Sequence, residues 1–353
     1  MRNPLADKIV DIKPSGIRKF FDIVNEMEDA ISLGVGEPDF DTPWHIRDEG
    51  IYSLEKGRTF YTSNAGLKEL RKEISNYVER SQGVHYDEMH EVLVTVGGSE
   101  AIDLALRAMI NPGEEVLIPQ PSKILILPFP NNPTGAIMEK KDLEEIAEII
   151  REKDIFVITD EIYAELSYKE KHVSIISLPG MRERTVYING FSKAYAMTGW
   201  RLGYACAPAQ IMEQMVKIHQ FAIMCAPTTS QYAAVEALRN GDEDVAQMRE
   251  AYNQRRRFLM NAFHEMGLQC FEPYGAFYVF PCIKEFGMTS DEFATRLLME
   301  EKVAVVPGTA FGGCGEGFLR ISYAYSLDSL KTAMGKIAHF VGKLREESKE
   351  KRD

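Results

Sequence analysis

The sequence has few cysteines, no long apolar run and no excess of basic residues. Its five cysteines are far apart in the 353 residues and form neither a CxxC pair nor a Cys/His cluster with zinc spacing. We therefore expect no metal site, and thiols that are buried or inert in a reducing compartment. The 41 Lys and Arg residues against 53 Asp and Glu give a net charge of −12, which argues against a nucleic-acid partner.

Export and membrane signals are also lacking. The first sixteen residues (MRNPLADKIVDIKPSG) contain no apolar core of a signal peptide. The apolar runs are shorter than the ~18 residues that a membrane-spanning helix needs. We therefore expect a cytoplasmic protein with no membrane association.

What the sequence does contain is an alternation of strands and helices. Such alternation favours a mainly parallel central sheet with helices on both faces, that is, an α/β fold. Past a long helical stretch over 243–266 the pattern changes to a smaller α+β domain. The predicted organisation is an N-terminal arm with part of the small domain (1–44), a large domain (45–245) and a C-terminal small domain (246–353).

Strand and helix bounds follow from the hydrophobic periodicity. The predicted strands are 91–96, 115–119, 123–130, 154–160, 185–190, 275–281 and 317–324. The predicted helices are 99–110, 141–153 and 290–301.

One junction departs from the alternation. The strand that ends at residue 119 is followed almost at once by the next, whereas parallel neighbours need a crossover of about a dozen residues. Residues 120–122 (QPS) also lack the chemistry of a tight hairpin. We expect that residues are missing between Ser122 and Lys123; the alternative is a deletion that removes a crossover helix.

Four polar motifs come at the ends of predicted strands. They are 97–100 (GGSE), 131–135 (NNPTG), 160–163 (DEIY) and 190–193 (GFSK). In open α/β sheets, ligands bind beyond the carboxyl ends of the strands. The four motifs are therefore predicted to converge on one crevice.

Taken singly, each motif also allows a structural interpretation. Gly97 and Gly98 before a helix suit a bound anion, or form a plain turn with Ser99 as N-cap. Asn132 before a proline is typical of turn chemistry. Asp160 is either a helix N-cap or the partner of a buried cation.

The cationic residues leave similar alternatives open. A loop lysine is usually solvated, but Lys193 has apolar neighbours that are consistent with a lowered pKa and a reactive amine. Arg201 and Arg320 occur in apolar contexts, and a buried guanidinium needs an anion. That anion is either a ligand or the carboxylate of an internal ion pair.

Together these groups match the needs of one cofactor. A lysine amine forms a Schiff base with an aldehyde, and a carboxylate keeps a pyridine nitrogen protonated so that the ring withdraws electrons. Glycine, serine and arginine groups hold a phosphate, and a second arginine binds a substrate carboxylate. This inventory is what pyridoxal 5'-phosphate requires.

At these residues the sequence resembles the class I aminotransferases of fold type I, from segment 32–40 (SLGVGEPDF) to segment 318–324 (FLRISYA). By this resemblance, Lys193 forms the Schiff base and later moves the proton, and Asp160 pairs with the pyridine nitrogen. Tyr163 and Asn132 donate to the ring phenolate oxygen.

The resemblance also implies the remaining site residues. The phosphate is held by Gly98, Ser99, Ser192 and Arg201, and the substrate α-carboxylate by Arg320 beside the backbone of Gly36. Tyr61 reaches the cofactor phosphate of a neighbouring subunit, which implies a homodimer, although a local cap on the following helix is the alternative. The family usually places an aromatic ring over the cofactor from the stretch after 119–122, so none is predicted here.

The implied activity is ping-pong transamination, in which an amino group passes from an L-amino acid to a 2-oxo acid such as 2-oxoglutarate. Ser99 stands where some dicarboxylate-specific relatives have lysine, so aromatic or small neutral amino acids are candidates. The motifs look close to the broad-specificity bacterial aminotransferase A. Two alternatives remain, a C–S β-lyase of the same fold and a non-catalytic, cofactor-binding regulator.

Overall fold

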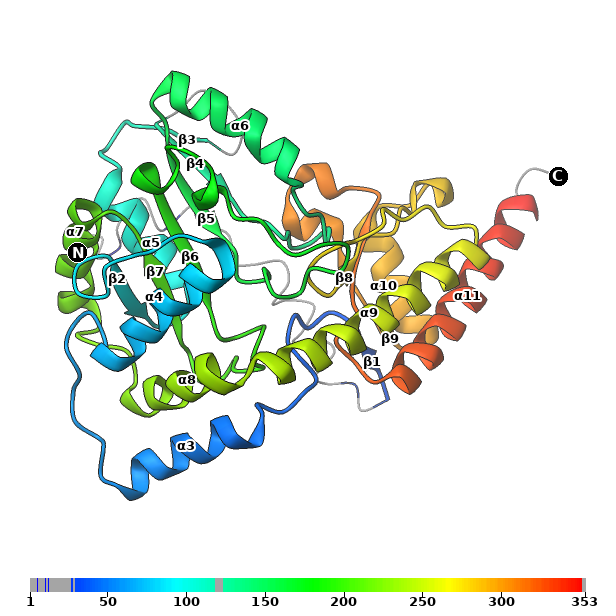
Figure 1. Cartoon of the computed structure of the whole chain (residues 1–353). Helices are drawn as coiled ribbons and strands as arrows, with labels where there is room; N and C mark the ends of the chain where they lie inside the picture. The colour runs from blue at the N-terminus through cyan, green and yellow to red at the C-terminus, as the bar shows by residue number, and fades with distance from the viewer. Residues whose placement is uncertain are drawn as a thin grey trace. The chain divides into compact units, whose positions relative to one another are not determined.

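A computed structural model of the protein describes residues 29–117 and 123–350, together with residues 5, 10, 12 and 27 (Figure 1). The chain divides into two compact units. Unit 1 comprises Met1–Gly36, Arg255–Glu272 and Tyr278–Asp353, and unit 2 comprises Glu37–Gln254 and Pro273–Phe277. Much of the predicted N-terminal arm lies outside the described residues.

Unit 2 is built on a six-stranded sheet in the order β2-β7-β6-β5-β4-β3. Strands β3 to β6 run parallel, and β7 is antiparallel to both of its neighbours. The bounds are β2 (Val92–Thr95), β3 (Val116–Leu117), β4 (Ile124–Leu127), β5 (Phe156–Asp160), β6 (Thr185–Gly190) and β7 (Gly203–Cys206). The mainly parallel sheet is confirmed, and β7 is an addition that the sequence pattern did not predict.

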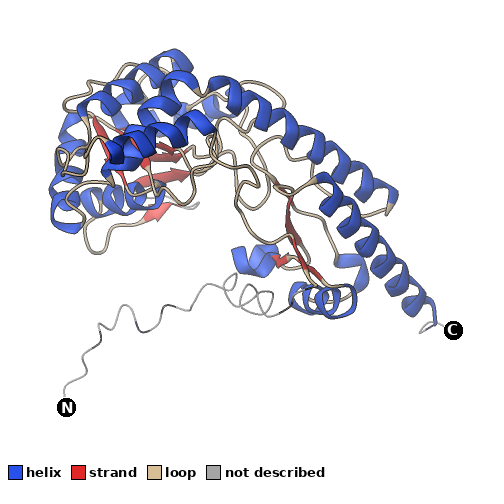
Figure 2. Ribbon diagram, turned by 90° about the horizontal axis from the view of Figure 1, so that it is seen from below, coloured by secondary structure: helices blue, strands red, loops and turns tan. Residues whose placement is uncertain are grey.

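Helices cover both faces of this sheet (Figure 2). They are α3 (Trp44–Glu55), α4 (Lys68–Gln82), α5 (Gly98–Met109), α6 (Lys140–Lys153), α7 (Ala209–Ala222) and α8 (Thr228–Asn240). Side chains alternate between the faces along each strand. Leu93, Ile158 and Ile188 pack with α5 and α7, whereas Val94 packs with α4 and α8 and Val157 packs with α6 on the opposite face.

Local sequence explains where the predicted helices begin and end. Helix α6 starts with a reciprocal capping box between Glu139 and Asp142, and it stops where Asp154 adopts left-handed backbone angles. Helix α5 ends at Met109, one residue before its predicted end. Predicted and observed bounds of both helices agree within one residue.

The link between β3 and β4 is unusually short for parallel neighbours. Val116 lies opposite Ile124 and Leu117 opposite Leu125, so only residues 118–123 connect two parallel strands. A parallel connection normally carries a crossover of about a dozen residues or more. Ser122 itself lies outside the described residues.

Unit 1 contains two small sheets. Strand β1 (Ile31–Ser32) pairs in parallel with β9 (Val303–Ala304). The second sheet is antiparallel, with β11 (Leu319–Ser322) between β10 (Val306–Pro307) and β8 (Tyr278–Val279).

The helices of unit 1 include α10 (Ser290–Glu301), at the predicted position, and α11 (Leu327–Glu350). Helix α9 (Asp242–Glu265) begins in unit 2 and ends in unit 1. These elements form the predicted smaller α+β body. Among the described helices, none has the length and apolarity that a bilayer crossing requires.

Candidate active site

The N-terminus of α5 presents a turn that is open to a ligand. Gly97, the N-cap residue, has a φ of 78°, and no side chain caps the helix. Ser99 is exposed and lies inside the first helical turn, so its alternative role as N-cap is wrong. The backbone N–H groups of a first helical turn are free to bind an anion.

Arg201 lies directly against this turn. A Cβ atom on Gly97 would be 2.9 Å from Nη2 of Arg201, and the φ of 78° at Gly97 is one that side chains rarely adopt, so glycine suits this position. The Arg201 Nη1 donates to the Thr198 carbonyl at 3.1 Å. Within the described residues no carboxylate forms an ion pair with Arg201, so the internal-ion-pair alternative is not realised. A free guanidinium beside a helix N-terminus is suited to a phosphate.

Asp160 ends β5 in a largely enclosed position. Its Oδ1 accepts a hydrogen bond from the Ile162 N–H at 3.2 Å. This bond resembles that of an N-cap residue, which is one of the two roles that the sequence allows for Asp160. Burial raises the pKa of Asp160 to about 6; the Ile162 bond lowers it and the Glu161 charge raises it. Within the described part of the chain, no cation pairs with this carboxylate. A cationic N–H group would therefore be stabilised here.

The fold brings Asp160 and the α5 turn to the same face of the sheet. Asp160 lies opposite Ile188 in the β5–β6 register. The Ile188 Cγ2 is 3.5 Å from the position that a Cβ on Gly98 would occupy. Both motifs consequently border one region, as predicted from their places at the strand ends.

Lys193 follows β6, and its amine lies beside a pair of aromatic rings. Its Nζ is 5.8 Å from the ring centroid of Tyr163 and 5.6 Å from that of Phe277. These two rings meet edge to face with centroids 5.5 Å apart. The apolar surroundings predicted for the amine are present, although the rings come from Tyr163 and Phe277.

Phe277 is a residue that the sequence analysis missed. It was placed inside a strand of the small domain, over 275–281, but the strand covers only Tyr278–Val279. Segment 273–277 belongs to unit 2, where the Gly275 N–H donates to the Gly135 carbonyl at 2.8 Å. A Cβ on Gly275 would be 2.4 Å from Pro130, a close approach that only glycine allows.

Two further predicted residues of unit 2 are exposed. Asn132 lies in a turn in which the Asn131 side chain accepts a hydrogen bond from the Thr134 hydroxyl at 2.9 Å. Tyr61 is 80% exposed and caps no helix, because α4 begins after Leu67. Ser192, by contrast, is nearly buried beside Lys193.

Arg320 and Gly36 belong to unit 1. Arg320 is buried in β11, and its Nη2 donates to the Gly34 carbonyl at 2.5 Å. Its guanidinium lies 4.6 Å from the ring centroid of Tyr278 and 4.8 Å from that of Phe311. The Tyr278 hydroxyl occupies the space that a Cβ on Gly36 would need. The arginine is thus held in a fixed orientation by aromatic contacts.

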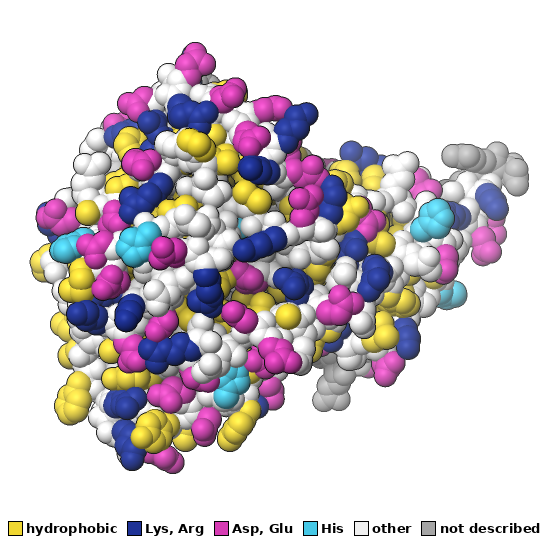
Figure 3. Space-filling view, viewed as in Figure 1, with side chains coloured by type: hydrophobic (Ala, Val, Ile, Leu, Met, Phe, Trp, Pro, Cys, Tyr) yellow, Lys and Arg dark blue, Asp and Glu magenta, His cyan; other side chains and the backbone are white. Residues whose placement is uncertain are grey.

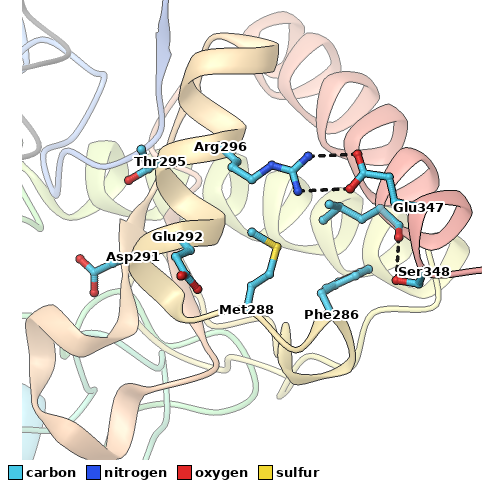
Figure 4. A pocket seen from close by; sticks show the side chains of 9 residues that line it. Phe286, Met288, Asp291, Glu292, Thr295, Arg296, Glu347 and Ser348 are labelled. Atoms are coloured by element: carbon cyan, nitrogen blue, oxygen red, sulfur yellow. Dashed lines mark hydrogen bonds and ion pairs between the residues drawn. The ribbon is translucent and has the colours of Figure 1, made fainter. Parts of the chain in front are cut away.

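A separate pocket in unit 1 contains none of the predicted residues (Figure 4). It measures about 540 Å³ and lies beside α10 and α11. Arg296 is paired there with Glu347 at 3.1 Å, and Asp291 and Glu292 add negative charge. On the face of the molecule in Figure 3, basic and acidic side chains are intermixed, without a basic patch.

Comparison with known proteins identifies the family. The model of the family aminotransferase class I and II matches residues 28–122 and 122–337. The Bacillus subtilis protein YugH, named as an aminotransferase, is 48% identical over 384 aligned residues, which cover 97% of this chain and 100% of that protein. The aspartate aminotransferase of Pyrococcus abyssi is 44% identical over 94% of this chain and 97% of its own.

A solved structure agrees with these relatives. The crystal structure of an aromatic aminotransferase from Pyrococcus horikoshii superposes with a TM-score of 0.87 at 39% identity, over 92% of this chain and 99% of that one. The predicted fold type I of the pyridoxal 5'-phosphate enzymes is therefore confirmed.

The comparisons also bear on the junction at residue 122. The two stretches of the family model meet at that residue. The alignment with the Bacillus protein, at 384 residues, is longer than the 353-residue chain. The break in the family match thus coincides with the short link between β3 and β4.

The close approach of β7 to the α5 turn generates a first prediction. A Cβ on Gly203 would be 2.7 Å from the Gly97 carbonyl carbon and the Gly98 nitrogen. Gly203→Ala is expected to lower the free energy of unfolding by about 1–3 kcal/mol through overpacking. Gly199→Ala is the control, because a Cβ there meets nothing within 4 Å. Urea unfolding of both variants checks this, and equal losses would contradict it.

The enclosed Asp160 carboxylate generates a second prediction, for protein purified without a bound small molecule. Burial raises its pKa in the folded protein to about 6, above the ordinary value of 3.8, so the free energy of unfolding falls as the pH rises through this window. Asp160→Asn removes this loss and is expected to raise the free energy of unfolding at pH 7.5 by up to about 3 kcal/mol.

Urea unfolding at pH 5 and pH 7.5 measures this pH dependence. The advantage of the asparagine variant should shrink at pH 5, where the wild-type carboxyl is mostly protonated. A variant less stable than wild type at both pH values would show that Asp160 already has a cationic partner in the protein alone.

Proposed function

The chain belongs to the class I and II aminotransferases and is a transaminase, and from this premise we propose that it binds pyridoxal 5'-phosphate at the ends of β5 and β6 in unit 2. The observation that carries the proposal is the Lys193 amine, which contacts the paired Tyr163 and Phe277 rings next to the strand that ends in Asp160. The names of the relatives support transamination and neither β-elimination nor a non-catalytic role.

The residues present fit this cofactor. Asp160 is enclosed and lacks a cationic partner in the described residues, which suits a protonated ring nitrogen. The space at Gly97 holds the Arg201 guanidinium beside the first turn of α5, which suits a phosphate. Gly98 and Ser99 contribute free N–H groups of that turn to the phosphate. We propose that Ser192, which follows β6, also binds the phosphate.

When bound, pyridoxal phosphate supplies an aldehyde and a ring that withdraws electrons from the substrate Cα. Lys193 then acts as the base that removes the Cα proton of the amino acid and as the acid that returns it. The contacts with the Tyr163 and Phe277 rings hold the amine at the end of β6, where this role places it. Asp160 holds a proton at the ring nitrogen, and Tyr163 and Asn132 donate to the ring oxygen.

Arg320 is assigned to the substrate α-carboxylate, with Gly36 beside it. Its aromatic contacts and its bond to Gly34 orient the guanidinium before any substrate arrives. An oriented guanidinium loses little freedom on forming a bidentate pair with a carboxylate. The same group serves the amino acid and the 2-oxo acid in the two halves of a ping-pong cycle, with 2-oxoglutarate as the proposed acceptor.

The relatives do not decide between donor classes, because one is named for aspartate and another for aromatic amino acids. We propose a neutral or aromatic donor. The support is the Ser99 side chain at the α5 turn, which adds no positive charge for a second substrate carboxylate.

We further propose a homodimer. Phe60, Tyr61 and Phe221 in unit 2 are 81%, 80% and 88% exposed, which is unusual for large apolar side chains within one chain. Burial of such rings against a second copy would be favourable by about 1.5–3 kcal/mol each. Tyr61 would then reach the cofactor phosphate of the partner subunit.

A half-reaction screen tests the activity and the donor. Each amino acid is added to cofactor-loaded protein, and the shift of the visible absorption band to that of the amine form is recorded. We expect phenylalanine or a small neutral amino acid to react faster than aspartate. Lys193→Ala is expected to slow the shift by on the order of 10³-fold or more, and an unchanged rate would refute the role of Lys193.

A mixed dimer tests the contribution of Tyr61. Lys193→Ala and Tyr61→Ala chains are each expected to be weakly active alone. When the two are expressed together, a hybrid dimer has one site with Lys193 from one chain and Tyr61 from the other, so activity is expected to recover to up to about half per dimer. Absence of recovery in a dimer confirmed by light scattering would place Tyr61 in the site of its own chain.

A further inference from the structure

A buried acidic residue directly follows Asp160 and faces the opposite side of the sheet. Side chains alternate along β5, so Ile158 and Asp160 face α5, whereas Val157, Thr159 and Glu161 face the side of α6. Glu161 is only 1% exposed. Carboxylates are almost never buried to this extent unless they are paired.

The Glu161 carboxylate is bound at both oxygens. Its Oε1 accepts hydrogen bonds from the Thr159 hydroxyl at 2.9 Å and from the Ser174 hydroxyl at 2.5 Å. Its Oε2 is 2.6 Å from Nε2 of His172. The Glu161 backbone N–H also donates to the Ile188 carbonyl at 2.9 Å, which ties the residue to β6.

His172 supplies the counter-charge. Burial by itself would lower its pKa, but the Glu161 charge and hydrogen bond, with a contribution from Glu165, raise it above 6.5. In its protonated form the imidazole therefore compensates the charge of the Glu161 carboxylate. The charge of Glu161 affects the neighbouring Asp160, because a negative charge nearby raises the pKa of the Asp160 carboxyl.

Other charged groups border His172 from α4, α9 and the loop after β5. A pocket of about 300 Å³ is lined by His172 together with Arg80, Glu165, Lys171, Asp242 and Arg249. Arg80 pairs with Asp242 at 3.3 Å, and Tyr77 donates to Glu165. The nearest carboxylate partner of the imidazole ring is thus Glu161.

We propose that the Glu161–His172 pair is a positioning device for the cofactor site: it anchors the end of β5 from the face opposite Asp160 and cancels the negative charge next to the Asp160 carboxylate. This inference rests on the proposed role of Asp160. In this proposal, Glu161 and His172 contact neither the cofactor nor the substrate. Their effect reaches the site through the backbone of residues 160 and 161 and through electrostatics.

The test is the pH dependence of pyridoxal phosphate binding to cofactor-free protein, followed by fluorescence quenching. Binding is expected to weaken at low pH, with a midpoint that reports protonation of Asp160, and the titrations of the cofactor itself are common to all variants. His172→Gln leaves the Glu161 charge uncompensated and is expected to move the midpoint up by about half a unit or more. Glu161→Gln removes that charge and is expected to move it down, and the double variant should lie between the two.

His45→Gln is the matched control, because the His45 ring binds Glu236 at 2.7 Å and Asp244 at 3.0 Å instead of Glu161. It should leave the midpoint unchanged. Circular dichroism shows whether each variant folds, and Glu161→Gln retains the shape of the side chain if His172→Gln does not fold. Weaker binding at every pH without opposite midpoint shifts would overturn the inference.

Asp160→Asn separates this outcome from a failure of the proposed function. If it abolishes the acidic midpoint while the Glu161 and His172 variants leave the midpoint in place, only the positioning role is wrong. If Asp160→Asn leaves the affinity and its pH dependence unchanged, Asp160 does not bind the ring nitrogen, and both proposals fail.

Discussion

Unit 2 depends on one constraint: the Asp160 carboxylate is enclosed and has no cationic partner among the described residues. Water no longer stabilises the charge of Asp160 well, and one backbone N–H cannot replace that solvation. The cost is tolerable because β5 is held in the middle of the sheet, between β4 and β6. A bound group with a protonated nitrogen would remove this cost, and the free energy recovered would add to the affinity for such a group.

Two of the site motifs contain a carboxylate that is shielded from solvent and paired with histidine. Glu100, next to Ser99, accepts hydrogen bonds from the Val96 N–H at 2.5 Å and from His219 at 2.8 Å. Glu161, next to Asp160, is paired with His172. In each case the polar contact holds the backbone that carries the site residue, while the site residue itself remains available to a ligand.

Glycine marks the places where two segments must approach closely. Gly203 in β7 contacts the backbone of the α5 turn, and Gly97 makes room for Arg201. Gly275 packs on Pro130 and so delivers Phe277 to the lysine. At Gly203 and Gly275 a side chain would displace neighbouring backbone or a proline ring, which links the packing of unit 2 to the placement of its functional groups.

The sequence by itself determined the strand–helix alternation and the polar motifs at the strand ends, because periodicity and turn chemistry are local properties. The sequence also showed that the connection between the two strands on either side of residues 120–122 is unusually short. Only the tertiary structure decided that β7 enters the sheet antiparallel, that Arg201 lies against Gly97 and that Phe277 returns to Lys193. These contacts join residues far apart in the chain, and their geometry depends on packing that no local pattern encodes.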